Sequence, residues 1–168
     1  MERRLRKLLP GGKFVEVPDR RAKTMAAIRG KHTQTTELRL RMAFVRAGIR
    51  GWRTNVGDLP GKPDFYFPEK RLAVFVDGCF WHGCPRCGHY PQTRQAFWKA
   101  KIRRNRERDR QQTKGLRENG IQVIRLWEHV LRDSQALERR IARIQYELQP
   151  GAIEQQLSKR RRRVWQRV

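Results

Sequence analysis

The chain has 168 residues, and its 40 lysines and arginines against 16 acidic residues give a formal net charge of +24. This length suits a single domain with one hydrophobic core, and so positive a field attracts polyanions, of which nucleic acid is the expected one. No run reaches the roughly 18 apolar residues of a membrane-spanning helix, and the basic start lacks the long apolar stretch of a secretory signal. We therefore expect a cytoplasmic protein with no membrane partner.

The first half of the chain predicts an arm, a helix and two strands. Residues 1–21 mix charged and turn-forming residues and are expected to form a flexible basic arm. A helix is predicted over about 36–47, where Leu38, Met42 and Val45 recur at helical spacing. "PDFYF" and "RLAVFVDG" then predict two short strands, and the near-continuous apolar run of the second is typical of a strand covered on both faces.

The second half of the chain predicts two further helices with a strand between them. A long polar helix is predicted over about 93–119, followed by a buried strand in "QVIRLWE" and a last helix over 130–148. Residues 149–168 are expected to be an Arg-rich tail. Helices on either side of a small mixed sheet predict an α/β sandwich.

The stretch "DGCFWHGCPRCGH", residues 77–89, contains every cysteine of the chain, at the spacing C-x4-C-x2-C. A two-residue gap lets two thiolates reach one ion at about 2.3 Å, and reduced thiols in a cytoplasmic protein favour a metal site over disulfides. The alternative is a set of reduced thiols in an apolar loop. Tetrahedral zinc needs a fourth ligand, and spacing alone leaves three candidates open. These are His82, His89 and His129.

Acidic residues are scarce, so those at strand and helix ends are candidates for chemistry. Asp64 lies where a turn becomes a strand, and a carboxylate there suits Mg²⁺, a hard ion used in phosphate chemistry; the alternative is a turn cap. Glu37 opens the first helix, where a negative charge is favourable without any catalytic role. Asp77 follows the apolar strand, and Asp109 stands among arginines on the long helix, whose basic face suits DNA phosphates or simply solvent.

Four stretches together resemble a known family. "GKPDFYF", "FVDGCFWHGCP", "FWKAKIRRNRERDR" and "VIRLWEH", in this order, are similar to the very-short-patch repair (Vsr) DNA mismatch endonucleases. The resemblance covers about residues 22–148. It implies a restriction-endonuclease-like fold and an enzyme that nicks duplex DNA on the 5′ side of the thymine in T:G mismatches, which arise by deamination of 5-methylcytosine.

The same resemblance implies roles for single residues. Asp64 would bind Mg²⁺ with the backbone carbonyl of Val76, and His82 would be the general base. The other acids at the catalytic site would be Glu37, Asp77 and Asp109, with the role of Asp77 open. The zinc ligands would be Cys79, Cys84, Cys87 and His129. The aromatic wedge that enters the base stack would be Phe80, Trp81 and Trp98, and further DNA contacts would come from Met25, Lys101 and Asn105.

These assignments explain why metal ligands and aromatic rings share one loop. A zinc ion that fixes the backbone would let one turn present His82 to the scissile phosphate and the rings to the bases. Insertion of rings costs a few kcal/mol of unstacking per base step, least at a mismatch, so it selects for mismatches. We expect a monomer that acts at the nucleoid on T:G-mismatched duplex DNA, with other mismatch-repair proteins as candidate partners.

Two other functions fit part of the sequence. A non-catalytic, zinc-stabilised nucleic-acid-binding module would explain the charge and the cysteines, but not Asp64, His82 and Asp109 in the family's order. A restriction-type nuclease of the same fold, acting on unmismatched sites, would explain the charge and the cysteines as well as these three residues.

Overall fold

A three-stranded sheet forms the centre of the part of the chain that this computed structural model describes, residues 2–9, 36–54 and 56–150. Strand β2 (Leu72–Asp77) is the middle strand; β1 (Phe65–Phe67) pairs with it antiparallel and β3 (Gln122–Trp127) pairs with it parallel. The predicted small mixed sheet is therefore confirmed. The restriction-endonuclease-like assignment stays a prediction.

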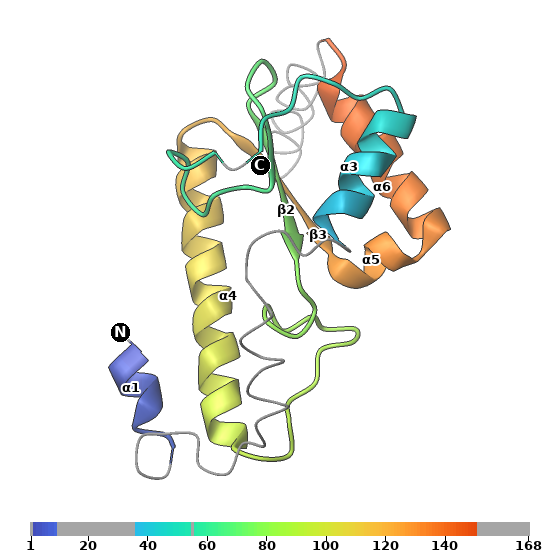
Figure 1. The fold of residues 1–168 in the computed structure, drawn as a ribbon. Coiled ribbons are helices and arrows are strands. Elements are labelled where there is room, and N and C mark those ends of the chain that lie inside the picture. The colour runs from blue at the N-terminus through green and yellow to red at the C-terminus, as the bar shows by residue number, and fades with distance from the viewer. Residues whose placement is uncertain (1, 10–35, 55, 151–168) are drawn as a thin grey trace, which may run out of the picture.

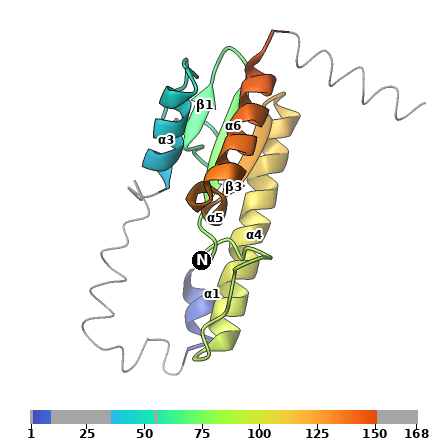
Figure 2. The ribbon, with the colours of Figure 1, turned by 90° about the vertical axis from the view of Figure 1, so that its right-hand side faces the viewer.

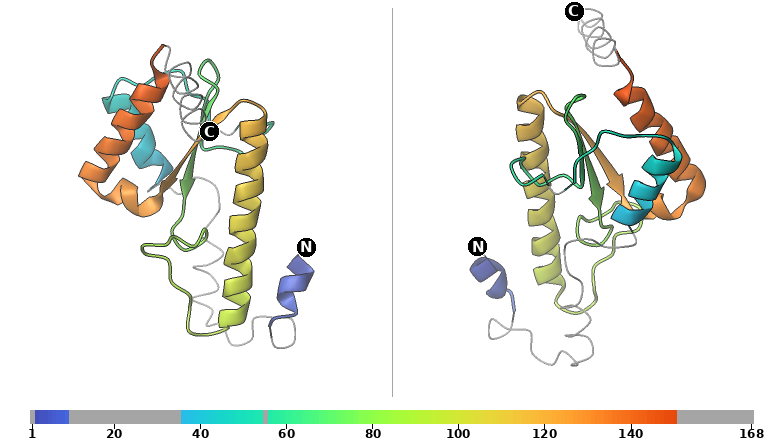
Figure 3. Two further views of the ribbon diagram at one scale, coloured as in Figure 1. Left: turned by 180° about the vertical axis from the view of Figure 1, so that it is seen from behind. Right: turned by 45° about the horizontal axis from the view of Figure 1, so that its top comes forward.

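Helices cover both faces of this sheet. Helix α4 (Gln95–Glu118) lies along one face, and α3 (Glu37–Arg46) and α6 (Ser134–Leu148) lie on the other (Figures 1 and 2). The view from behind shows the same arrangement (Figure 3). Successive side chains of β2 pack alternately against the two helical layers. The α3–α6 core contains Leu72 and Val74, whereas Ala73 and Phe75 pack with Leu116 of α4.

The predicted coverage of the strands holds for β2 and is wrong for β3. In β2 five of six residues are buried, as expected for a strand between two helical layers. In β3 only Leu126 is buried. The reason is position: β2 has a strand on each side, while β3 is the outer strand of the described sheet.

Helix α3 has the predicted extent but buries a different face. Leu40 and Phe44 are fully buried, at 0 % exposed. The ring of Phe44 packs edge-on against Phe65 of β1, with centroids 5.1 Å apart. The residues on which the helix was predicted are instead exposed, at 49 %, 44 % and 55 %: Leu38, Met42 and Val45. Both series have helical spacing, and the aromatic side chains of β1 select the one that contains Phe44.

The last predicted helix is two helices. Helix α5 (Glu128–Arg132) begins directly after β3, and α6 follows it. Asp133 between them is extended, with φ −98° and ψ 115°, and its carboxylate accepts a hydrogen bond of 2.9 Å from the backbone N–H of Ala136. This is an N-cap, which typically contributes about 1 kcal/mol. The long helix, by contrast, has close to its predicted bounds.

The expected flexible arm is wrong for residues 2–9. Helix α1 (Glu2–Arg6) packs beside α4 (Figure 1). Leu5 and Leu9 are buried with Phe97, and Trp98 borders this cluster. Residues 10–21, Met25 and the tail from residue 151 onward lie outside the described residues. Within the described ranges, no helix combines the length and apolar character that a bilayer crossing requires.

Candidate active site and metal centre

The site residues gather at the carboxyl-terminal ends of β2 and β3. The parallel register pairs Asp77 with Trp127, so both strands end at the same edge of the sheet. The cysteine loop leaves directly after Asp77, as predicted, and α5 begins directly after Trp127. Open α/β sheets place ligands at this edge. Residues 50 positions apart in the sequence, Cys79 and His129, therefore come into contact.

Three cysteines and one histidine form a compact donor cluster. The Nδ1 atom of His129 lies 3.3 Å, 3.5 Å and 3.4 Å from the sulfurs of Cys79, Cys84 and Cys87. All four donor atoms lie within 4.8 Å of one another. Tetrahedral zinc ligands at about 2.1–2.3 Å from the ion would be about 3.6 Å apart. The cluster can therefore hold a metal, with His129 in the place that spacing had left open.

The two competing histidines lie elsewhere. His82 contacts carboxylates, and His89 is exposed, with its ring centroid 6.1 Å from that of Phe80. Burial and, next, the contact with Cys87 raise the pKa of the Cys79 thiol to about 12. A thiolate at Cys79 therefore needs a nearby cation, which agrees with a metal-binding role.

Backbone hydrogen bonds shape the loop around these donors. The N–H of Cys84 donates to the carbonyl of Cys79 at 2.8 Å, and the N–H of Cys79 donates to the Glu128 carboxylate at 3.2 Å. Gly83 has a left-handed φ of 63°, and a Cβ there would lie 2.6 Å from Ile102 of α4. Only glycine fits both this backbone conformation and this close approach. The loop is thus pressed onto α4 beside His82.

Asp64 immediately precedes β1, next to the carboxyl-terminal end of β2. Its carboxylate accepts a 2.6 Å hydrogen bond from the backbone N–H of Val76. Burial, together with the nearby negative charges of Glu37 and Asp77, raises the pKa of Asp64 to about 7 against the opposing effect of the Val76 hydrogen bond. Three carboxylates thus crowd one place, and a bound cation would relieve their repulsion.

The predicted second oxygen ligand, the carbonyl of Val76, belongs to the residue whose N–H donates to Asp64. Oxygen atoms of a carboxylate and a backbone carbonyl are ligands that Mg²⁺ accepts. The residues present therefore fit a magnesium ion.

His82 makes a short hydrogen bond to Asp109 of α4. Nδ1 of the imidazole and Oδ2 of the carboxylate are 2.6 Å apart, and the two side chains are 21 % and 13 % exposed. Burial raises the pKa of Asp109, but the His82 bond and the positive charges of Arg125 and Arg108 outweigh it, so the pKa lies below its usual value. An ionised Asp109 keeps the proton on Nδ1 and leaves Nε2 as the basic nitrogen.

The three predicted wedge residues form one aromatic cluster. The ring of Phe80 lies 5.0 Å from Trp81 and 5.3 Å from Trp98, and the two tryptophans are 6.1 Å apart. Each ring is half-buried against the others rather than fully exposed. The cluster joins the cysteine loop to the start of α4, one residue from His82.

Comparison with known proteins identifies the family of this chain. The family model described as "DNA mismatch endonuclease Vsr" matches residues 15–87. The type II nicking enzyme V.XorIIP of Xanthomonas oryzae pv. oryzae is 41 % identical over 129 residues, which are 76 % of this chain and 93 % of that protein. The chain belongs to the Vsr family.

Further relatives agree. The DNA mismatch endonuclease Vsr of Escherichia coli is 40 % identical over 119 residues, 70 % of this chain and 74 % of that protein. The type II nicking enzyme V.NaeI of Lentzea aerocolonigenes is 42 % identical over 113 residues, 65 % of this chain and 68 % of its own length. This Vsr-family chain is therefore a DNA endonuclease.

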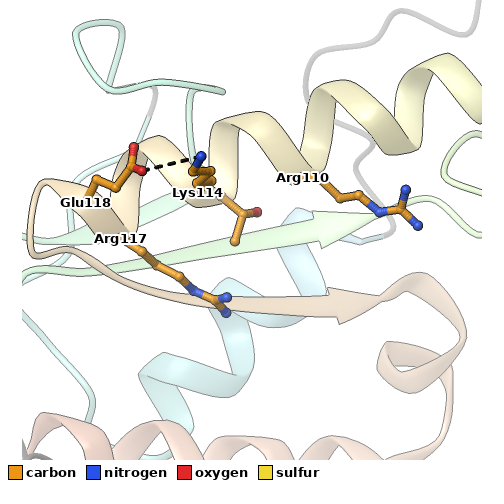
Figure 4. Close-up of a pocket in the computed structure, with 5 residues that line it drawn as sticks. Arg110, Lys114, Arg117 and Glu118 are labelled. Carbon is orange, nitrogen blue, oxygen red and sulfur yellow. Dashed lines mark ion pairs between the residues drawn. The ribbon is translucent and has the colours of Figure 1, made fainter.

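The remaining predicted DNA contacts lie on α4. The side-chain amide of Asn105 donates to the backbone carbonyl of Trp81 at 2.8 Å, so it supports the cysteine loop. Lys101 lies one turn earlier and is half-buried. Beyond Asp109 the helix presents a shallow basic surface (Figure 4), where Lys114 is paired with Glu118 at 3.7 Å. The labelled cations are Arg110, Lys114 and Arg117.

Sequence reasoning missed two residues of this Vsr-family site. Glu128 accepts the Cys79 N–H and is paired with Arg132. Arg125 of β3 donates to both carboxylate oxygens of Asp77, at 2.7 Å and 2.6 Å. The available signal was a charged residue within the apolar run of "QVIRLWE", because a charge in a strand packed under a helix needs a partner.

Proposed function

We propose that this endonuclease nicks duplex DNA on the 5′ side of the thymine in T:G mismatches. The observation that carries the proposal is the convergence, at one sheet edge, of Asp64, the His82–Asp109 pair and the aromatic cluster. A hydrolytic group next to half-buried rings suits an enzyme that cuts where bases separate easily.

Each step of the proposed hydrolysis is assigned to residues of this site. Nε2 of His82 takes a proton from the attacking water, and Asp109 holds the ring by Nδ1 at 2.6 Å. Asp64 and the carbonyl of Val76 would hold Mg²⁺, which when bound supplies positive charge for the transition state and the leaving oxygen. Glu37 and Asp77, whose charges act on Asp64, complete the negative surroundings of that position.

The donor cluster is proposed as a structural zinc site. Three thiolates and one imidazole are a ligand set typical of closed, tetrahedral zinc. The ion would tie the loop to the end of β3 through His129 and so fix the backbone on either side of His82. This separates the metal that holds the fold from the metal that serves the reaction.

Selectivity is assigned to the rings of Phe80, Trp81 and Trp98. A T:G pair is weaker than a matched pair, so the cost of unstacking, a few kcal/mol per step, is lowest there. The basic surface of α4 (Figure 4) would contact phosphates, which hold DNA without reading sequence. The restriction-type alternative differs in substrate and not in chemistry.

The test is a nicking assay on paired substrates. Duplexes with a single T:G or T:A pair in the same flanking sequence, labelled on one strand at a time, are incubated in Mg²⁺ and in EDTA. We expect nicking of the thymine strand of the T:G duplex in Mg²⁺ alone, and none with the His82→Ala variant. Equal nicking of T:A would favour the restriction-type function, and no nicking of any duplex would favour a binding module.

A further inference from the structure

Arg125 forms an extended set of contacts behind the reacting residues. Its guanidinium donates to both oxygens of Asp77, lies 3.6 Å from Asp109, and approaches the Thr113 hydroxyl at 3.4 Å. It also stacks over the ring of Phe75, 4.6 Å from its centroid. The side chain is 22 % exposed, so these contacts are made largely away from water.

The partner of this arginine, Asp77, is a buried carboxylate close to His82. Asp77 is 5 % exposed, and its Oδ1 atom lies 3.6 Å from Nδ1 of His82. A buried carboxylate needs a cation or several hydrogen-bond donors to remain charged. Arg125 supplies two donors in the planar fork that matches a carboxylate. The imidazole of His82 is a second donor beside this carboxylate, at 3.6 Å.

His82 therefore lies between two carboxylates and has one Nδ1 proton to give. Asp109 takes it at 2.6 Å, and Asp77 lies about one ångström further away. A ring turned toward Asp77 would move Nε2, the nitrogen proposed to accept the proton of water. A displacement of about 1 Å in a reacting group typically costs on the order of 10²-fold in rate.

We infer that Arg125 is a positioning residue that occupies both oxygens of Asp77 and thereby leaves Asp109 as the partner of His82. The inference rests on the proposed role of His82 as the general base. Its physical content is selection between two acceptors. The guanidinium hydrogen-bonds both oxygens of the acceptor on β2. It lies 3.6 Å from Oδ1 of the acceptor on α4 and leaves the Oδ2 atom of that carboxylate to His82. Arg125 itself touches neither water nor phosphate in this role.

The test compares four variants of the full chain. Arg125→Met removes the guanidinium and keeps a long apolar stem over Phe75. Asp77→Asn removes the competing charge, and the double variant Asp77→Asn with Arg125→Met shows what the loss of Arg125 costs once that charge is gone. Arg143→Met is the matched control, because Arg143 pairs at 2.6 Å with Glu147, a carboxylate only 3 % exposed on α6, far along the chain from the site.

Three quantities are measured on each variant: thermal stability, the single-turnover nicking rate at saturating T:G duplex, and the Nδ1–H proton resonance of His82. The chain has four histidines, so comparison with His82→Ala assigns the resonance. We expect Arg125→Met to lose rate on the order of 10²-fold and to shift the resonance. Asp77→Asn sets its own reference rate, because the charge of Asp77 also acts on Asp64. Adding Arg125→Met to Asp77→Asn should change neither rate nor resonance further, and Arg143→Met should change stability alone.

Two results would overturn the inference. One is an Arg125→Met protein that melts earlier but keeps the parent rate and resonance, which would make the pair purely structural. The other is a double variant that is slower than Asp77→Asn by the same factor by which Arg125→Met is slower than the parent, which would show that Arg125 acts in some way other than restraining Asp77. Failure of the proposed function is distinguishable: a His82→Ala protein that nicks like the parent would refute the base, whereas the resonance would still report on Arg125.

Discussion

The two histidines at the strand ends, His82 and His129, show how neighbours decide what one side chain does. The Nδ1 atom of His129 faces three sulfurs at 3.3–3.5 Å. The Nδ1 atom of His82 faces a carboxylate at 2.6 Å, with a second carboxylate near it. Soft, converging donors suit the first to its proposed role as a metal ligand, and an acidic acceptor suits the second to its proposed role as an oriented base.

The two sites share one loop, and this division has a mechanical consequence. The cysteines hold the loop to α5 from one side, while Gly83 and Asn105 fix it to α4 from the other. His82 lies between these attachments. Loss of the metal cluster should therefore damage both sites, whereas loss of a catalytic group should leave the metal cluster intact.

The largest effect is expected from Cys84→Ser. Cys84 is 3 % exposed and lies within the donor cluster, and structural zinc contributes directly to folding. The variant should lose its zinc, melt at a much lower temperature and show no nicking. Elemental analysis and thermal melting check this, and a parent protein that is fully folded without metal would contradict it.

The next effect is expected from Asp64→Asn. The substitution removes a charge at the proposed magnesium position and keeps the shape of the side chain. Nicking in Mg²⁺ should fall below detection, while DNA affinity stays within a few-fold because Lys and Arg contacts supply it. Asp58→Asn is the control, an exposed acid outside the site. A nicking rate near that of the parent would remove Asp64 from the mechanism.

A smaller effect is expected from the aromatic cluster. Phe80→Ala removes the ring that contacts both tryptophans at 5.0 Å and 5.3 Å. The ratio of T:G to T:A nicking should fall by roughly tenfold, a fraction of the unstacking energy that the rings exchange with DNA. Tyr90→Ala, which removes an exposed ring outside the cluster, should leave the ratio unchanged. An unchanged ratio in Phe80→Ala would show that the mismatch is recognised elsewhere.

Much of this fold follows from local pattern. Strand β2 is a near-continuous apolar run and helix α4 a long polar stretch, and both were predicted within about two residues of their bounds. Helix α3 shows where pattern fails. Its sequence contains two apolar series at helical spacing, and only the contact of Phe44 with Phe65 decides which one is buried. That contact joins distant segments and leaves no trace in the helix itself.

The candidate site also contains features that local pattern predicts and features that depend on contacts between distant segments. The cysteine cluster was visible as spacing, but its fourth ligand depends on the parallel register of β2 and β3, which brings His129 to the loop. Asp133 carried a readable capping signal that would have divided the predicted last helix at this residue. The contact of Arg125 with Asp77 could not be predicted from local pattern. It depends on the pairing of Phe75 with Arg125 across the sheet, because that register places the guanidinium on Asp77.

The most direct test of this division of roles is a comparison of His82→Ala with His129→Ala. Zinc content, melting temperature and single-turnover nicking of a T:G duplex are measured on both. We expect His82→Ala to keep its zinc and its melting temperature and to lose about 10²–10⁴-fold in rate, as removal of a general base does. His129→Ala should lose zinc, stability and activity together. Zinc loss in His82→Ala, with the metal retained in His129→Ala, would contradict the account.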